Sequence, residues 1–276
     1  MEAEVNSGRP APAGAPALEK GLDLLEALAV EDGALTQKQL AARVGRSVSE
    51  VFRMLGVLER RGYIARDAKT GEYSLTLALF RLATHHPPMR RLQRVALPIM
   101  QALADTTGLG CHLSMLSSGQ LLIVGVADPD RPMGWAVKLG GVFPFAPSYV
   151  SARVLAAFQR DRRREEMVRL LAAEAAQEEA ALTQRLDRIA AAGYDLVASE
   201  LIDGFIDISC PILDEHGQAA AALTLPFLPR FAKRQDASEC LALLKRAARD
   251  ISAQVGGTTT PEPHANTDPG ETGERR

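Results

Sequence analysis

The stretch GRSVSEVFRMLGVLERRGYIARDAKTGEYSL (residues 45–75) decides the fold of the N-terminal part of this chain. Ser47 and Glu50 have the spacing of a capping box, apolar residues follow at helical intervals, and Gly62 is placed to end the helix. Apolar and polar residues then alternate on both sides of residues 68–71, which indicates a β-hairpin. The stretch therefore predicts a helix followed by a two-stranded wing.

Two further helices are expected before this stretch. In residues 18–29, leucines recur at intervals of three or four residues and give one apolar stripe, formed by Leu18, Leu22, Leu25 and Leu28. Residues 36–45 offer Thr36 as the N-cap of a short helix and Gly45 as its stop. Three helices and a hairpin predict a winged helix-turn-helix over residues 17–75.

Charge is distributed unevenly along the chain. The 276 residues carry a formal net charge of −2. Residues 33–75, however, hold eight basic residues against four acidic ones, a local charge of +4. Such asymmetry indicates that this segment has a polyanionic partner. Aromatic residues make up only 5% of the chain, which disfavours stacking on single strands. We expect the basic segment, with its helix and hairpin, to read DNA.

The remainder of the chain predicts a linker and a second domain. Residues 76–94 read as helical and are interrupted by Pro87 and Pro88, where we place a joint. Residues 95–255 mix helices with strands, the strands being expected at residues 111–128, 133–140, 194–199, 206–214 and 218–227, and a long helix at residues 232–255 closes the domain. The fold class is thus α+β (mixed). Residues 1–16 and 256–276 lack the apolar content to fold and are predicted to be disordered.

Several classes of protein are disfavoured. No window approaches the roughly 18 apolar residues of a membrane span, and the N-terminus has no secretory pattern. Three scattered cysteines fit a reducing cytoplasm. No phosphate-binding loop or dinucleotide fingerprint occurs, and Cys111 and His112 are strand neighbours that point to opposite faces. We therefore expect no enzyme activity, no cofactor, no metal and no membrane partner.

These segments resemble the IclR family of bacterial transcription regulators. The similarity rests on ALEKGLDLLEAL (residues 17–28) and LTQKQLAARVGRSVSEVFRMLGVLERRGYIARDAKTGEYSLTLALFRLA (residues 35–83). LPIMQALADTTGLGCHLSML (residues 97–116) and RIAAAGYDLVASELIDGFIDISCPILDEHGQAAAALTL (residues 188–225) keep the family's order. The resemblance implies a GAF-like effector domain, a small-molecule effector, a homodimer or homotetramer, and a near-palindromic operator in double-stranded DNA.

The expected DNA contacts centre on the helix predicted between its cap, Ser47, and its terminator, Gly62. Its polar face, opposite Val51, Leu55 and Leu58, is free to enter a major groove about 12 Å wide. The resemblance matches Arg53 and Ser49 to the family's recognition helix, whereas Val48 and Glu50 depart from its pattern. The full set of expected contacts is Gln37, Lys38, Arg46, Ser47, Ser49, Glu50, Arg53, Arg66 and Lys69.

Some of these residues have a competing structural role. Ser47 and Glu50 are helix-capping residues first, although a carboxylate can also accept from cytosine N4. Arg66 and Lys69 could contact phosphates, but each could equally be a surface charge that makes no contact with DNA. One winged helix makes few base contacts, so we expect two copies to pair through residues 18–28 and the linker helix.

The resemblance also implies an effector site between the sheet and the loop that leads into SARVLAAF (residues 151–158). The matching positions, with Trp135 added as a wall, are Trp135, Phe145, Ala146, Ser148, Tyr149, Asp207, Ser209, Cys210 and Thr224, followed by Pro226. Asp207 departs from the family pattern, and a buried carboxylate would repel an anionic ligand unless it were protonated or paired, for which Arg153 is the candidate. We hypothesise a neutral, hydroxylated or cationic ligand; the alternative is that Asp207 faces solvent on an edge strand.

Two other functions stay open from the sequence. Cys210 or Cys111 offers a thiol for a redox-sensing regulator, although buried cysteines are commonly inert. A sensor module whose winged helix binds protein rather than DNA is the third possibility.

Overall fold

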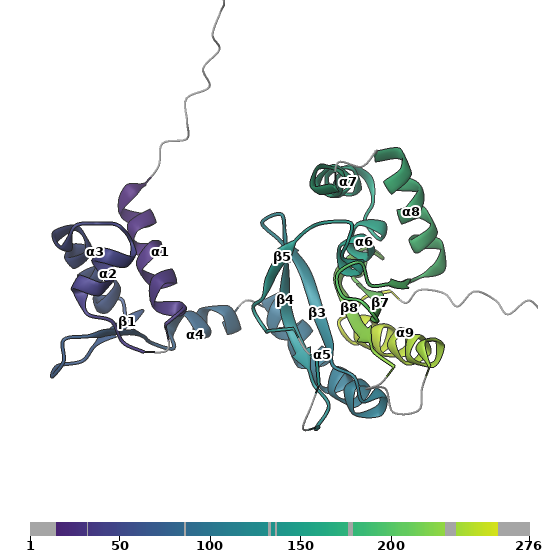
Figure 1. Cartoon of the computed structure of the whole chain (residues 1–276), viewed down its shortest axis with the longest axis horizontal. Coiled ribbons are helices and arrows are strands. Elements are labelled where there is room, and N and C mark those ends of the chain that lie inside the picture. Colours follow the sequence, from purple (N-terminus) through teal and green to yellow (C-terminus); the bar gives the residue numbers. More distant parts are fainter. Residues whose placement is uncertain are drawn as a thin grey trace, which may run out of the picture. The chain divides into compact units, whose positions relative to one another are not determined.

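The structure is a computed structural model that describes residues 15–31, 33–85, 87–131, 134–135, 137–175, 179–229 and 236–258. It divides into two compact units, Met1–Met89 and Arg90–Arg276 (Figure 1). The division falls inside the segment that the sequence predicts to be a linker. The segments predicted to be disordered, residues 1–16 and 256–276, lie almost wholly outside the described residues.

The first unit is a winged helix-turn-helix, as predicted. Its elements are α1 (Pro16–Ala29), α2 (Gln37–Arg43), α3 (Val48–Arg60), β1 (Ile64–Arg66), β2 (Tyr73–Leu75) and α4 (Ala78–His85). The strands β1 and β2 pair antiparallel, and Leu35 adds a single bridge to Tyr73. The hairpin is the wing that the alternating pattern predicts.

The ends of the helices follow from local chemistry. Thr36 and Ser47 each form a complete capping box, with Gln39 and Glu50 as the reciprocal partners. Gly45 and Gly62 follow the C-terminal ends of α2 and α3 with φ of +61° and +76°, a backbone region that favours glycine. The predicted start and end of both helices are confirmed.

The predicted leucine stripe of α1 splits between the core and the surface. Leu28 is buried, but Leu18 and Leu22 are exposed, and the buried residue one turn before Leu28 is Leu24. Leu24 and Leu28 are four residues apart and pack in one cluster with buried residues of α2, α3, β1 and β2. The predicted helix is therefore confirmed; within it Leu24 and Leu28 face the core, whereas Leu18 and Leu22 of the predicted stripe remain on the surface.

The second unit contains a six-stranded antiparallel sheet and five helices among the described residues. The helices are α5 (Pro87–Thr107, begun in the first unit), α6 (Val150–Ala157), α7 (Asp161–Ala175), α8 (Glu179–Ala192) and α9 (Ala237–Gln254). The strands are β3 (Cys111–Ser117), β4 (Gln120–Ala127), β5 (Val142–Pro144), β6 (Asp195–Ala198), β7 (Ile206–Leu213) and β8 (Ala219–Phe227). Their order in the sheet is β5-β4-β3-β8-β7-β6, with antiparallel pairing throughout.

Helices cover both faces of the middle of this sheet. Both α6 and α9 contact β7 and β8 (Figure 1). Eight of the nine residues of β8 are buried, and successive strand residues point to opposite faces, so both faces must be covered. Buried residues of α6, α7 and α8 form one core with Leu121, Phe145, Ala219 and Ala222. The mixed α+β class is confirmed.

Two details differ from the sequence prediction. The strand expected at residues 133–140 is wrong: the described residues of that segment are irregular, residues 139–140 form a turn with Gly140 at φ +77°, and strand β5 follows at Val142–Pro144. The expected interruption at Pro87 and Pro88 is present but shorter than predicted: α4 ends at His85 and α5 begins at Pro87, because a missing N–H is tolerated in the first turn of a helix. Residues 232–235 of the expected last helix lie outside the described residues; α9 begins after its N-cap, Asp236.

Candidate nucleic-acid interface and effector cavity

The helix α3 has one buried and one exposed face. Val51, Leu55 and Leu58 pack into the core of the first unit. The side chains of Val48, Ser49, Phe52 and Arg53 are exposed, with Ser49 and Arg53 on the side opposite the core, and Gly56 continues the exposed surface one turn later. We call these five residues the α3 outer face. It contains the predicted contacts Ser49 and Arg53, together with Phe52 and Gly56, which were not predicted from the sequence.

The start of α3 is fixed by Glu50. One carboxylate oxygen accepts hydrogen bonds from the backbone N–H and the hydroxyl of Ser47, at 3.2 and 2.7 Å. The other oxygen accepts from Nζ of Lys20 on α1 at 2.6 Å. The hydrogen bonds from Lys20 and then Ser47 lower the pKa of Glu50 to about 2. Both oxygens are thus engaged within the protein, which supports the capping role of Glu50 over a base contact.

Some of the other predicted DNA contacts in the helix-turn-helix interact with residues of the protein itself. Gln37 Nε2 donates to the carbonyl of Val48 at 3.0 Å and so ties α2 to the start of α3. The guanidinium of Arg46 lies 3.8 Å from Asp23 of α1, and Lys38 is exposed at the start of α2. The hydroxyl groups of Ser47 and Ser49 lie 3.3 Å apart.

The wing is shaped by Asp67. Its carboxylate accepts from the backbone N–H groups of Thr70 and then Lys69, and these bonds lower the pKa of Asp67. Arg66 donates to the carbonyl of Gly71 at 3.4 Å, and its guanidinium lies 5.6 Å from the ring centre of Tyr73. Arg66 therefore stiffens the hairpin, whereas the Lys69 side chain lies exposed at the tip.

A cavity of about 540 Å³ lies in the second unit, against strands of the sheet, the start of α6 and residues 199–202. Four of the predicted effector residues line it: Trp135, Tyr149, Asp207 and Thr224. Pro226 is also part of its wall. Five others do not line it: Phe145, Ala146, Ser148, Ser209 and Cys210.

The positions of three of these five residues explain why they do not line the cavity. Phe145 is fully buried in the core formed with α6, α7 and α8. The hydroxyl of Ser209 lies 2.9 Å from that of Thr224, so Ser209 supports a wall residue without reaching the cavity. Cys210 is buried on β7 directly after Ser209. Because successive strand residues point to opposite faces, its side chain points away from the face that carries Ser209.

Several residues of the wall were not predicted from the sequence, namely His112, Lys138, Ser151, Ser199, Leu201 and Ile202. His112 was considered only as a partner for Cys111. Burial lowers the pKa of His112 to about 4, so the cavity presents a neutral imidazole at neutral pH. The position of His112 in a predicted strand could have indicated that it lines the cavity, because it pairs in register with Thr224, another wall residue.

Asp207 does not face solvent on an edge strand. It lies on β7, which is flanked by β6 and β8. Burial raises the pKa of its carboxyl group, and a hydrogen bond from the hydroxyl of Ser199 only partly opposes this. The hypothesised partner is wrong, because Arg153 pairs instead with Asp195, across 2.6 Å. Arg153 acts on Asp207 only through its charge.

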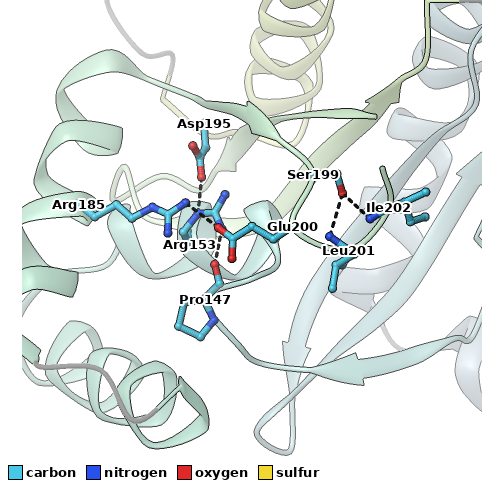
Figure 2. Close-up of polar contacts among 8 residues, drawn as sticks. All are labelled: Pro147, Arg153, Arg185, Asp195, Ser199, Glu200, Leu201 and Ile202. Carbon is cyan, nitrogen blue, oxygen red and sulfur yellow. Dashed lines mark hydrogen bonds and ion pairs between the residues drawn. The ribbon is translucent and has the colours of Figure 1, made fainter. Parts of the chain in front are cut away.

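Arg153 organises the residues beside the cavity (Figure 2). Its side chain is 0% exposed and donates to Asp195 and to the carbonyl of Pro147. The carboxylate of Glu200 lies 3.7 Å from Arg153 and 3.2 Å from Arg185 of α8. We call Arg153, Asp195, Glu200 and Arg185 the arginine cluster.

The arginine cluster fixes a segment of the cavity wall. Glu200 stands between Ser199 and Leu201, both of which line the cavity. The hydroxyl of Ser199 accepts from the backbone N–H groups of Leu201 and Ile202, at 3.3 and 3.4 Å (Figure 2). The ion pairs of Glu200 and the turn formed by Ser199 therefore hold this part of the wall in place.

The three cysteines are free and buried. Burial raises the pKa of Cys111 and Cys210 to about 12, and that of Cys240 to about 11. A thiol with a raised pKa carries little thiolate at neutral pH and reacts slowly. This disfavours a redox sensor. Among the described residues there is also no group of three potential metal ligands, and no helix long and apolar enough to cross a membrane.

The winged helix-turn-helix of one unit and the cavity of the other define a class, that of transcription regulators with an effector domain. Two family models match the chain: the IclR helix-turn-helix domain over residues 17–68, and the bacterial transcriptional regulator IclR C-terminal domain over residues 88–253. The chain therefore belongs to the IclR family of bacterial transcription regulators.

Individual relatives agree with this assignment. The transcriptional regulator KdgR of Escherichia coli is 27% identical over 241 residues, covering 86% of this chain and 91% of the relative. The repressor IclR of the same organism is 23% identical over 265 residues, covering 90% and 95%. Among solved structures, Pseudomonas aeruginosa HmgR has a TM-score of 0.69 at 28% identity, covering 87% of this chain and 99% of that one.

Proposed function

We propose that this protein is a cytoplasmic, ligand-responsive transcription regulator without enzyme activity. It binds a near-palindromic operator as a homodimer or homotetramer, and a small metabolite in the cavity changes its affinity for that operator. The single observation that carries the proposal is the α3 outer face, which presents Ser49 and Arg53 to solvent while the opposite face anchors the helix in the core. A helix held in this way can enter the major groove of duplex DNA.

A mobility-shift titration tests the operator binding. The probe is the DNA upstream of the protein's own gene, measured at rising salt, since release of counterions makes DNA binding strongly salt-dependent. Arg53→Ala should weaken binding by about 1–3 kcal/mol, the range for a good base contact. Arg169→Ala, which removes an exposed arginine from α7, is the matched control and should leave binding unchanged. No shift by the wild-type protein at low salt would favour a winged helix that binds protein.

Exposed apolar side chains of the first unit support the pairing of two copies. Leu18 and Leu22 of α1 are exposed, as are Leu77, Phe80 and Leu82 in and beside α4. Apolar groups left in water favour association, and α1 and the linker helix are the surfaces expected from the sequence to pair. Light scattering of Leu18→Glu and Leu22→Glu variants should show a shift toward smaller species; an unchanged mass would place the interface elsewhere.

The cavity supports a small, mainly apolar ligand. Its wall combines apolar residues with a few polar groups, as small-molecule sites do. Burial raises the pKa of Asp207, and its carboxyl group can accept a hydrogen bond from a hydroxyl group in either form, while its ionised form would attract a cation and repel an anion. The proposed ligand is therefore neutral, hydroxylated or cationic.

Calorimetric titration with ligand classes tests the ligand proposal. The hydroxylated or cationic class should bind the wild-type protein and lose affinity in Asp207→Ala. Tight binding of a small dicarboxylate to the wild-type protein, lost in Asp207→Arg, would overturn the proposal.

The proposed regulation is a coupling between cavity and operator. Such couplings are typically about 1–3 kcal/mol, which changes operator occupancy by roughly 5–150-fold. The segment of residues 199–202 is the part of the wall that a ligand would contact next to the arginine cluster. Glu200→Gln should therefore alter the response to ligand more than the affinity of the ligand-free protein for DNA.

A further inference from the structure

The α3 outer face is unusual because it exposes two large apolar side chains. The side chain of Phe52 is 58% exposed and that of Val48 is 48% exposed. A single exposed apolar residue is common on protein surfaces and needs no explanation by itself. Phe52, however, directly precedes Arg53 and lies one turn from Ser49, beside the two polar residues expected to enter the groove.

The same face contains a glycine, Gly56, at a position where the fold does not require one. Gly56 lies inside α3, four residues after Phe52, where glycine destabilises a helix relative to alanine. Its φ is not positive, and a Cβ built on it would meet no atom within 4 Å. Neither backbone conformation nor packing within the first unit explains this glycine. A surface without a side chain at this point does allow a partner to come close to the helix.

The start of the face is also cleared of negative charge. Glu50 points back to Lys20 and Ser47, and both of its oxygens are occupied there. The first two turns of the outer face therefore present a hydroxyl group, two apolar side chains and one guanidinium. In the major groove only thymine carries a methyl group, and phenylalanine is one of the side chains that contacts it.

We propose that Phe52 determines operator specificity by contacting the 5-methyl group of a thymine in the major groove. Arg53 contacts the neighbouring base pair or its phosphate, Val48 adds apolar surface at the start of the helix, and Gly56 leaves room for the DNA one turn later. This inference rests on the proposed function, because it names what the α3 outer face reads once the helix lies in the groove.

The test separates a methyl contact from any other use of the ring. Duplexes that the full-length wild-type protein binds are first selected from a random DNA library. Each thymine of the selected site is then replaced singly by deoxyuridine, which keeps the base pair and removes only the methyl group. At the contacted thymine the wild-type protein should lose about fourfold in affinity, the value for burying one methyl group. Phe52→Ala should bind both duplexes equally.

A matched variant controls for helix stability. Val57→Ala shortens another exposed apolar side chain of α3, about 140° around the helix from Phe52 by helical geometry. It should keep both the affinity and the sensitivity to deoxyuridine. Because Phe52 and Val57 are both exposed, each variant should unfold at the same temperature as the wild-type protein.

The outcomes separate this inference from the proposed function. If the wild-type protein selects no duplex, the proposed function fails and this inference fails with it. If it selects a site but no thymine is sensitive to deoxyuridine, operator binding stands and the role of Phe52 is overturned. That role is also overturned if Phe52→Ala binds more weakly yet remains fourfold sensitive at that thymine, because the ring would then act elsewhere.

Discussion

Arg53 in the first unit and Arg153 in the second show two opposite uses of the same side chain. Arg153 is 0% exposed and is surrounded by Asp195, Glu200 and the carbonyl of Pro147. Arg53 is exposed and makes no hydrogen bond or ion pair with any of the residues that the structure describes. Removing a charge from water has a large free-energy penalty, so a buried arginine must have partners within the fold. An exposed arginine needs none and remains available to a second molecule.

The largest effect expected from this comparison is on folding. Arg153→Ala leaves Asp195 buried without its partner, and breaking a buried pair in this way destabilises a protein by about 3–5 kcal/mol. Urea unfolding monitored by circular dichroism measures this, because both units contain helices. Arg53→Ala is the matched control and should unfold as the wild-type protein does. Equal stability of the two variants would break the comparison.

A somewhat smaller effect should appear as pH dependence of the second unit. The pKa of His112 is about 4 in the folded protein and 6.5 when unperturbed, so between these values the unfolded state binds more protons. Stability from the neutral, buried imidazole is therefore complete above pH 6.5 and falls as pH decreases toward 4, by up to about 3 kcal/mol.

The measurement that isolates His112 is the difference between the wild-type protein and His112→Gln. Melting temperatures of both are recorded from pH 7 to pH 4, and the wild-type protein should lose more stability on acidification. Parallel profiles would mean that His112 does not titrate in this range.

The smallest expected effect separates stability from DNA binding on one residue. Gly56→Ala should stabilise the first unit by about 0.5–1 kcal/mol, because alanine is the better helix former and a Cβ has free space there. The same change should weaken operator binding, because the methyl group occupies the space left for DNA. Thermal unfolding and a mobility shift on the same samples measure the two effects. A variant that is more stable and binds equally well would remove the reason offered for this glycine.

The first unit could be predicted from the sequence almost completely. Capping boxes at Thr36 and Ser47, and glycines at the helix ends, are local signals that act over three to five residues. The burial of α1 was less predictable: the 3.6-residue period identified a helix, but the leucines supply two stripes, and only packing against α2 and α3 selects the one with Leu24 and Leu28.

The cavity could be predicted only in part. The resemblance identified Tyr149, Asp207 and Thr224, and Trp135 was added from the segment that precedes them. Three other wall residues, Lys138, Leu201 and Ile202, lie in irregular segments, and no periodic sequence pattern predicts the path of such segments. The pairing of Arg153 with Asp195 was missed because the two residues are 42 positions apart and meet only when α6 packs near β6.

By itself, the sequence determined the kind of protein. It predicted a winged helix-turn-helix with an exposed basic face, followed by an α+β domain, which is the domain order of the IclR family. Helix caps, turns and alternating strands suffice for this, because each is set by neighbouring residues. Only the tertiary structure decided which charges are available to partners. It ties Glu50 to Lys20, encloses Arg153 and leaves Arg53 in solvent, since the cost of burying a charge depends on what the folded chain places beside it.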